Sequence, residues 1–331
     1  MKSEGYKISA ITVHNSLNAK KNCNELCIIK SLSYRNVDSL LKKIDPENSK
    51  KLILGSGIVE AISSKNNFSK SQFLWNNPET IFKLNDPSYL FSKLSSLGIK
   101  IPSWQKNPPS KGNYLCKDIR SYGGLLVRKF KRPEGVKPNK YIYYQKYISG
   151  RNISVQFFSK SGKFRVLSTC LQWNYKTTEK TFLLGGIVAI KLKQILMRNI
   201  KNILKILIEN FKLSGINSVD FIISRGKENI YLIDINPRPG LSSNILYKLK
   251  LNRSILNRSS QIIYSTKDRL FDEYSINILH KIDPNIEFTE IPLAGTIIKK
   301  NQPICLVHRK VAKLKFLKTE YKEILKKINN I

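Results

Sequence analysis

Short apolar segments separated by polar turns recur along the chain, and their spacing predicts alternating strands and helices. Residues 7–13 alternate as in a strand, and residues 36–44 carry a helical apolar spacing. Residues 51–54 form an apolar run that enters Gly55-Ser56-Gly57, after which a helix is expected from Ile58. A strand, a glycine turn and a helix are typical of α/β proteins. We therefore predict a small α/β domain over the first 80 residues.

A helix and a hairpin are predicted next. Asp86 and Pro87 indicate the start of a helix that ends at Gly98, because an acidic N-cap and a proline at the first position favour initiation. Residues 113–117 and 125–130 are strand-like and flank a loop that contains Gly123 and Gly124. The loop is either a simple turn or a flap whose main-chain amides bind phosphates.

Two further strands, 141–148 and 152–158, precede a long amphipathic helix over residues 192–213. We expect this helix to pack on a sheet and to end at a glycine cap, Ser214-Gly215. Its predicted buried face consists of Leu192, Ile195, Leu196, Ile200, Ile203, Leu204, Leu207 and Phe211.

The segment from 215 to 240 carries the candidate chemistry. Residues 219–224 and 230–235 are apolar strands joined by a polar turn, which predicts an antiparallel hairpin. Asp234 and Asn236 share one face of the second strand because they are two residues apart, and Asp220 can lie opposite them. An unpaired buried carboxylate is costly, so these acidic groups need a partner.

Magnesium is one such partner, because Mg²⁺ is typically bound by one or two carboxylates, water and nucleotide phosphates. Arg238, again two residues on, would project from the same face and neutralise a transferring phosphoryl group. The alternative is structural: a buried aspartate paired with an arginine, and an asparagine at a turn before Pro237.

Asp220 followed by Asp234-x-Asn236-x-Arg238-Pro239-Gly240 resembles the metal and phosphate signature of ATP-grasp enzymes. The similarity to D-alanine–D-alanine ligase and biotin carboxylase continues upstream in chain order. Residues 86–102 resemble the entry helix of these enzymes, Lys117 with the two glycines resembles their phosphate-binding lysine and flap, and residues 144–148 resemble the adenine-binding hinge.

A narrower resemblance is to predicted ATP-dependent carboligases related to biotin carboxylase, a group that has tyramine–glutamate ligase as a relative. It is carried by residues 55–60, by Tyr144-Gln145, by residues 234–240 and by residues 292–306. The chain departs from the family at Pro87, where many members have a phosphate-contacting lysine, and at Asn152, where a ribose-binding glutamate is common. Lys93 is a candidate substitute for that lysine.

The resemblance implies an α/β (α+β) protein with an ATP-grasp fold and a shortened, Rossmann-like N-terminal domain. The implied domains are the pre-ATP-grasp domain at 1–80, a small subdomain with the glycine flap at 81–145, a large subdomain with the Mg–ATP site at 146–250, and a C-terminal extension packed on the core at 251–331. The implied ATP-binding residues are Lys117, Ser121, Gly123, Gly124, Gln145, Lys146, Tyr147 and Ile148. The implied ligands of Mg²⁺, or of Mn²⁺, are Asp220, Asp234 and Asn236, and the implied catalytic residues are Arg238 and Lys117.

The activity implied by the resemblance is ATP-dependent carboxylate–amine ligation through an acylphosphate. The tyramine–glutamate ligase relative extends this expectation to glutamate ligation in the synthesis of a one-carbon-carrier cofactor of the methanofuran or methanopterin type. A bicarbonate-dependent carboxylase of the biotin carboxylase type would share every ATP residue. A basic nucleic-acid-binding protein that kept the fold without catalysis is the third interpretation.

Composition changes this picture little. The 58 Lys and Arg against 23 Asp and Glu give a net charge of +35, but the basic residues are scattered, which favours a solvated surface over a nucleic-acid patch. The 5 cysteines include no CxxC pair, so neither a disulfide framework nor a zinc site is indicated. No apolar run approaches the ~20 residues that span a bilayer, and the N-terminus does not resemble a signal peptide. We expect a cytoplasmic protein with small carboxylate and amine substrates and no membrane partner, and we leave a homodimer open.

Overall fold

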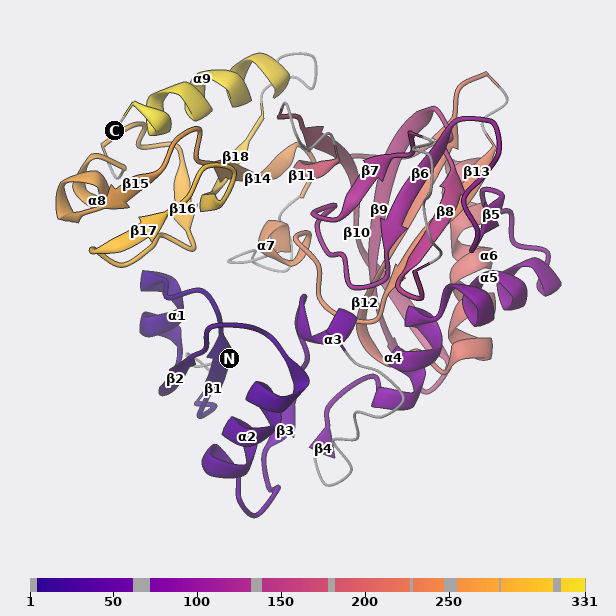
Figure 1. Cartoon of the computed structure of the whole chain (residues 1–331), viewed down its shortest axis with the longest axis horizontal. Coiled ribbons are helices and arrows are strands. Elements are labelled where there is room, and N and C mark those ends of the chain that lie inside the picture. The colour runs from indigo at the N-terminus through magenta and orange to yellow at the C-terminus, as the bar shows by residue number, and fades with distance from the viewer. Residues whose placement is uncertain are drawn as a thin grey trace.

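Among the described residues, two larger β-sheets of unequal size, two short parallel strand pairs and one short antiparallel pair organise the protein, which is described here from a computed structural model (Figure 1). The structure describes residues 5–61, 72–131, 139–177, 182–226, 229–246, 255–279, 281–311 and 317–330. No helix within these ranges is long and apolar enough to span a bilayer.

The N-terminal part is a small α/β unit, as the alternation of its segments predicts. Its strands pair in parallel, β1 with β2 and β3 with β4. Its elements are β1 (Ser9–Thr12), α1 (Leu17–Asn22), β2 (Glu25–Ile28), α2 (Tyr34–Ile44), β3 (Lys51–Leu52), α3 (Ile58–Ala61) and β4 (Gln72–Phe73). Val37 of α2 and Ile58 and Val59 of α3 are buried in its own apolar core.

The smaller sheet has the order β5-β8-β6-β7 and is antiparallel throughout. Its strands are β5 (Trp104–Gln105), β6 (Tyr114–Asp118), β7 (Val127–Lys129) and β8 (Ile142–Lys146), and the helices α4 (Pro78–Asn85) and α5 (Pro87–Ser96) precede them. The predicted start of α5 is confirmed: Pro87 is its first residue, and the Asp86 side chain accepts a hydrogen bond from the Ser88 amide at 2.9 Å. The predicted hairpin around the glycine loop is also confirmed, as β6 and β7.

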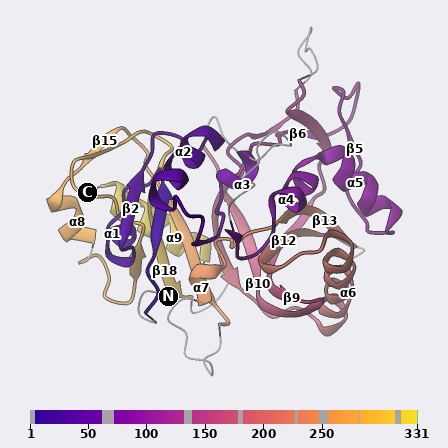
Figure 2. The same ribbon diagram turned by 90° about the horizontal axis from the view of Figure 1, so that it is seen from below.

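The larger sheet has the order β13-β12-β9-β10-β11-β14-β18-β16 and is also antiparallel. Its first five strands along the chain are β9 (Gly150–Lys160), β10 (Lys163–Tyr175), β11 (Leu183–Ala189), β12 (Gly215–Ser224) and β13 (Ile230–Asn236). Side chains alternate between its two faces: Val155 and Phe157 are fully buried in the core with helix α6 (Gln194–Phe211), whereas Ser154 and Gln156 point the other way. Figure 2 shows α6 lying along this sheet. The polar face is therefore available for a site.

Two details of α6 differ from the prediction. The helix ends at Phe211, and the left-handed residue after it is Lys212, with φ of 53°, rather than Gly215. Gly215 instead opens β12, where the indole of Trp75 packs on its backbone. Ile195 was expected on the buried face but is 54% exposed, and Ile208 is buried in its place. Leu196 in the same turn is buried in the core, so the buried face of the helix passes beside Ile195 rather than through it.

The C-terminal part extends the larger sheet with β14, β18 and β16, and its strands β15 and β17 form a separate antiparallel pair. Its elements are α7 (Ser243–Leu246), β14 (Arg258–Tyr264), β15 (Arg269–Phe271), α8 (Glu273–Leu279), β16 (Glu287–Thr289), β17 (Thr296–Ile298), β18 (Pro303–Lys310) and α9 (Leu317–Asn329). β14 pairs with β11, which joins this part to the rest of the sheet. Ser16, just before α1, donates a hydrogen bond to Glu290 at 2.9 Å, so the N-terminal and C-terminal parts of the chain are in contact; α1 lies beside this part in Figure 1.

A prediction follows from Gly215. Its φ is +71°, and a Cβ there would collide with the indole of Trp75, so Gly215→Ala combines backbone strain with overpacking. Gly98 is a matched control, because its φ is +69° and a Cβ would meet nothing within 4 Å. We expect Gly98→Ala to cost about 1 kcal/mol of unfolding free energy and Gly215→Ala about 2 kcal/mol more, measured by urea unfolding. Equal losses would contradict the packing of Trp75 on Gly215.

Candidate active site

A cleft of about 1310 Å³ lies between the two sheets, and the N-terminal helix α3 and the C-terminal helix α9 also contribute to its wall. All the residues that the sequence assigns to a site line this one cleft, although they come from five separate stretches of chain. They are Lys117, Ser121, Gly123, Gly124, Gln145, Lys146, Tyr147, Ile148, Asp220, Asp234, Asn236 and Arg238. The structure therefore brings the whole predicted set together.

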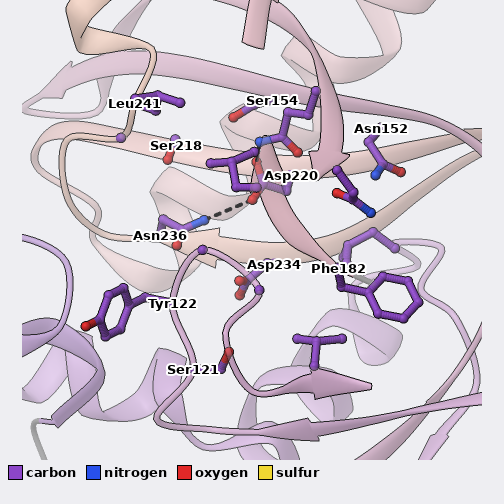
Figure 3. A pocket seen from close by; sticks show the side chains of 18 of the residues that line it. Ser121, Tyr122, Asn152, Ser154, Phe182, Ser218, Asp220, Asp234, Asn236 and Leu241 are labelled. Carbon is purple, nitrogen blue, oxygen red and sulfur yellow. Dashed lines mark hydrogen bonds between the residues drawn. The ribbon is translucent and has the colours of Figure 1, made fainter. Parts of the chain in front are cut away.

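The two aspartates face each other across the β12–β13 hairpin. Asp220 is paired with Asp234 and Ser218 with Asn236, and a register shift follows directly after Asp220. The Asn236 amide donates to Asp220 Oδ2 at 3.2 Å, which is the dashed line in Figure 3. Gln172 of β10, which sequence reasoning missed, donates to Asp220 Oδ1 at 3.2 Å. Gln172 lies within a strand of mixed polar and apolar residues that contains no motif, so the sequence carried no signal for it.

Burial perturbs both carboxyl groups. It raises the pKa of Asp220 to about 6, and the nearby Asp234 adds to the rise. Burial also raises the pKa of Asp234, an effect that Lys117 and Arg238 oppose, even though solvent reaches Asp234 from the cleft. Burial and mutual repulsion disfavour the ionised forms of these two carboxyl groups. A bound cation would stabilise the ionised forms, so the pair is a favourable cation site.

The donor set fits Mg²⁺ in particular. No three His, Cys, Asp or Glu side chains gather as a metal site anywhere in the described ranges, so an all-protein cage is not formed there. Mg²⁺ does not need one, because it commonly keeps several waters and binds one or two carboxylates together with substrate phosphates. A half-turn of the Asn236 amide would present its oxygen to the same space as Asp220 and Asp234.

Lys117 lies on β6, in the wall opposite the acidic pair. Burial lowers its pKa, and Asp234 and Asp220 act in the other direction by favouring the charged ammonium. Its Nζ lies 5.8 Å from the centre of the Tyr143 ring. The ammonium therefore faces the carboxylates across the space between the two sheets.

The glycine loop presents main-chain donors to the same space. Gly123 and Gly124 have φ of 57° and 78°, a conformation that exposes successive amides. In the part of the chain that the structure describes, the amides of Tyr122, Gly123 and Gly124 donate to no other group, whereas that of Ser121 donates to the Asp118 carbonyl at 2.9 Å. Figure 3 shows Ser121 and Tyr122 across the cleft from Asp220 and Asn236.

The segment after β8 forms one end of the cleft. The Lys146 amide donates to the Ser103 carbonyl at 2.7 Å and the Tyr147 amide to the Asn113 carbonyl at 2.9 Å. Among the described residues, the Ile148 amide and the side-chain nitrogen of the buried Gln145 have no acceptor. This end of the cleft therefore keeps polar groups that a flat heterocycle can satisfy.

Comparison with known proteins agrees with this geometry. Residues 84–242 match the family model described as the ATP-grasp domain. This stretch of the chain is an ATP-grasp domain. It contains the small sheet and most of the polar cleft face, and it ends just after Arg238. No curated protein sequence matches the chain.

Solved structures resemble the chain well beyond the ATP-grasp domain. Carboxyaminoimidazole ribonucleotide synthase of Aspergillus clavatus, complexed with ATP, has a TM-score of 0.73 at 10% identity, covering 100% of this chain and 94% of the other. L-amino acid ligase of Bacillus licheniformis has a TM-score of 0.68 at 12% identity, covering 92% and 87%. Pyruvate carboxylase of Rhizobium etli has a TM-score of 0.67 at 12% identity, covering 97% of this chain and 35% of that longer one. The predicted ATP-grasp fold is confirmed.

Arg238 has a partner that the sequence did not reveal. It was expected to project freely beside Asp234 and Asn236, but its Nε and Nη2 donate to Glu60 Oε1 at 3.0 and 2.5 Å. Glu60 lies on α3, outside the ATP-grasp domain. In the sequence, Glu60 stands out only as the last residue of the stretch 55–60, because nothing in a linear pattern links positions 178 residues apart.

Asn76 fixes the loops on which Arg238 depends. Its amide nitrogen donates to Asn217 Oδ1 at 2.7 Å and to the Pro237 carbonyl at 3.0 Å, and its oxygen accepts from the Ser214 amide at 2.9 Å. Asn76 is buried, so these bonds are made away from water. Asn76, which precedes the ATP-grasp domain, thus holds the start of β12 and the end of β13, the two strands that carry the acidic pair.

The raised pKa of Asp220 predicts an unusual dependence of stability on pH. Because the folded protein holds this proton more tightly than the unfolded chain, its ionisation destabilises the fold as the pH rises between 3.8 and about 6. Asp220→Asn should therefore stabilise the protein without added metal above about pH 6, and the gain should disappear toward pH 3.8, as measured by urea unfolding in EDTA.

Asp268→Asn is a control of opposite sign. The backbone amide of Lys300 and the Lys299 ammonium lower the pKa of this exposed carboxyl, so its removal should destabilise the protein at neutral pH and matter less in acid. An Asp220→Asn variant that is less stable than the wild type at neutral pH in EDTA would contradict the strained acidic pair.

Proposed function

We propose that the chain is an ADP-forming carboxylate–amine ligase that activates its acid substrate as an acylphosphate. The observation that carries the proposal is one cleft in which Asp220 and Asp234 face Lys117, with the free amides of the glycine loop across from them. The ATP-grasp domain and the resemblance to ligase structures support this chemistry.

In the proposed mechanism, the adenine lies at the β8 end, where the Ile148 amide and the Gln145 side chain have unmet hydrogen-bonding capacity. The loop amides from Tyr122 to Gly124 cradle the phosphates and exclude water. Asp220, Asp234 and Asn236 would hold Mg²⁺, which when bound would neutralise charge on the β- and γ-phosphates.

The chemical steps follow from these positions. A substrate carboxylate oxygen attacks the γ-phosphorus, the bond to the β-phosphate oxygen breaks, and ADP leaves. Lys117 and Arg238 stabilise the charge on the transferring phosphoryl group. An amine then attacks the acyl carbon, phosphate leaves with the electron pair, and the nitrogen loses a proton to give the amide. This sequence needs no nucleophilic side chain, only orientation and charge.

For the substrates, we extend the proposal to glutamate ligation in the synthesis of a one-carbon-carrier cofactor of the methanofuran or methanopterin type. The support for this extension is the resemblance of the sequence to tyramine–glutamate ligase. A bicarbonate-dependent carboxylase is the rival, and the likeness to carboxyaminoimidazole ribonucleotide synthase and pyruvate carboxylase folds favours keeping it in the test.

The acidic pair is tested by a substitution at Asp234. Asp234→Asn should lower ATP-dependent phosphate release at least ~100-fold, comparable to the loss of a transition-state electrostatic contact. The exposed Asp268→Asn serves as a control with expected wild-type turnover. An Asp234→Asn variant with near wild-type activity in a steady-state assay would exclude Asp234 as a metal ligand.

The second prediction separates ligase from carboxylase. ADP formation should require a carboxylic acid together with an amine, glutamate being the first acid to screen, and bicarbonate should not replace the acid. ADP formed with bicarbonate and a nitrogen acceptor would favour the carboxylase instead. Salt-sensitive binding of DNA or RNA without any ATP turnover would support the non-catalytic alternative and overturn both.

A further inference from the structure

Both oxygens of the Glu60 carboxylate are engaged. Oε1 accepts from the Nε and Nη2 of Arg238 at 3.0 and 2.5 Å, and Oε2 accepts from the Gly57 amide at 2.5 Å. The side chains of Arg238 and Glu60 are only 8% and 9% exposed, respectively. Glu60 therefore ties the glycine turn of the N-terminal unit to a guanidinium of the ATP-grasp domain.

This contact leaves part of Arg238 facing the cleft. A guanidinium has five N–H donors. Two go to Glu60, and one from Nη1 reaches the Pro239 carbonyl at 3.5 Å. The other two have no acceptor among the described residues, and Arg238 lines the cleft. The contact with Glu60 thus fixes the edge of the guanidinium that carries Nε and Nη2, and it leaves two N–H donors that can bind a ligand in the cleft.

Without Glu60, Arg238 would have a competing partner close by. Arg238 lines the same cleft as Asp220 and Asp234, and it follows Asn236, whose amide donates to Asp220, by two positions. A guanidinium released from Glu60 would move toward these two carboxylates, because opposite charges attract strongly where water is partly excluded. It would then occupy the space between the carboxylates and compete with any cation there.

We propose that Glu60 is a positioning residue that holds Arg238 away from the acidic pair and directs it at the transferring phosphoryl group. The N-terminal unit then completes the site that the ATP-grasp domain begins. The inference rests on the proposed ligase function for its kinetic consequences, but not for the contact itself.

The test is a double-mutant cycle with Glu60→Gln and Arg238→Ala, measured as kcat, as KM for ATP and as the Mg²⁺ concentration for half-maximal rate. Glu60→Gln should lower kcat by ~10- to 100-fold, leave KM for ATP within about threefold, and raise the Mg²⁺ requirement, because the released Arg238 competes for the carboxylates. In the Arg238→Ala background, Glu60→Gln should have no further effect on kcat or on the Mg²⁺ requirement.

Glu320→Gln is the matched control. It breaks the ion pair of Glu320 with Arg309, which is 2.6 Å long and has side chains 14% and 26% exposed, in the C-terminal part of the chain. It should leave kcat and the Mg²⁺ requirement at wild-type values. If Glu60→Gln unfolds, Glu60→Asp replaces it in the cycle, since it keeps the charge and withdraws it by one methylene. Multiplicative effects of the two substitutions, or an unchanged Mg²⁺ requirement, would overturn the proposal.

A second readout separates this inference from the ligase function. The same cycle is measured on the Kd of Mg–AMP-PNP by calorimetry, which needs no acid or amine. Non-additive nucleotide binding in a protein without ligase turnover would contradict the proposed function and support the positioning role. Ligase turnover with additive effects in both assays would overturn the positioning role and leave the function standing.

Discussion

The repulsion between two carboxylates on one hairpin is the constraint to which the rest of the cleft responds. Asp220 and Asp234 face each other in register, and burial makes their ionisation more difficult still. The fold compensates with cations from two other stretches of chain, Lys117 on the opposite wall and Arg238 beyond the end of β13. Arg238 in turn forms an ion pair with the carboxylate of Glu60. Positive and negative side chains therefore line the cleft together, and the two adjacent carboxylates of Asp220 and Asp234 are the natural position for a divalent ion.

Local patterns predicted the parts of this arrangement that depend on local geometry. The period of two along a strand is enough to place Asp234 and Asn236 on one face, and a short polar turn is enough to bring Asp220 opposite them. The cap at Asp86 and the hairpin around Gly123 follow from similarly short signals. The predictions that failed depend on packing between distant segments. Helix α6 ends at Phe211, before Gly215, whose backbone packs against Trp75, and Ile195 is exposed although Leu196 beside it is buried. The Glu60 and Gln172 contacts have no sequence signal, since neither partner lies near the other in the chain.

The ATP-grasp domain covers the motifs, yet the cleft is completed from outside it. Asn76 and Glu60 precede the matched residues and hold the backbone and the guanidinium at the end of β13. The C-terminal part continues the large sheet through β14, and its helix α9 reaches the same cleft. The likeness to solved structures across nearly the whole chain, at 10 to 12% identity, is consistent with this shared architecture.

The attachment of the glycine loop has a consequence for how fast nucleotide can exchange. The Gly123 carbonyl accepts a hydrogen bond from the Leu184 amide at 2.9 Å, and Gly124 lies so close to the Phe182 carbonyl that no side chain would fit. The loop is thereby fastened to the first residues of β11, the strand that pairs with β14 of the C-terminal part. Moving the loop aside means breaking a main-chain bond and separating two closely packed backbones. Under the proposed function, ATP entry and ADP departure would then be activated steps whose barrier is set in part by these loop contacts.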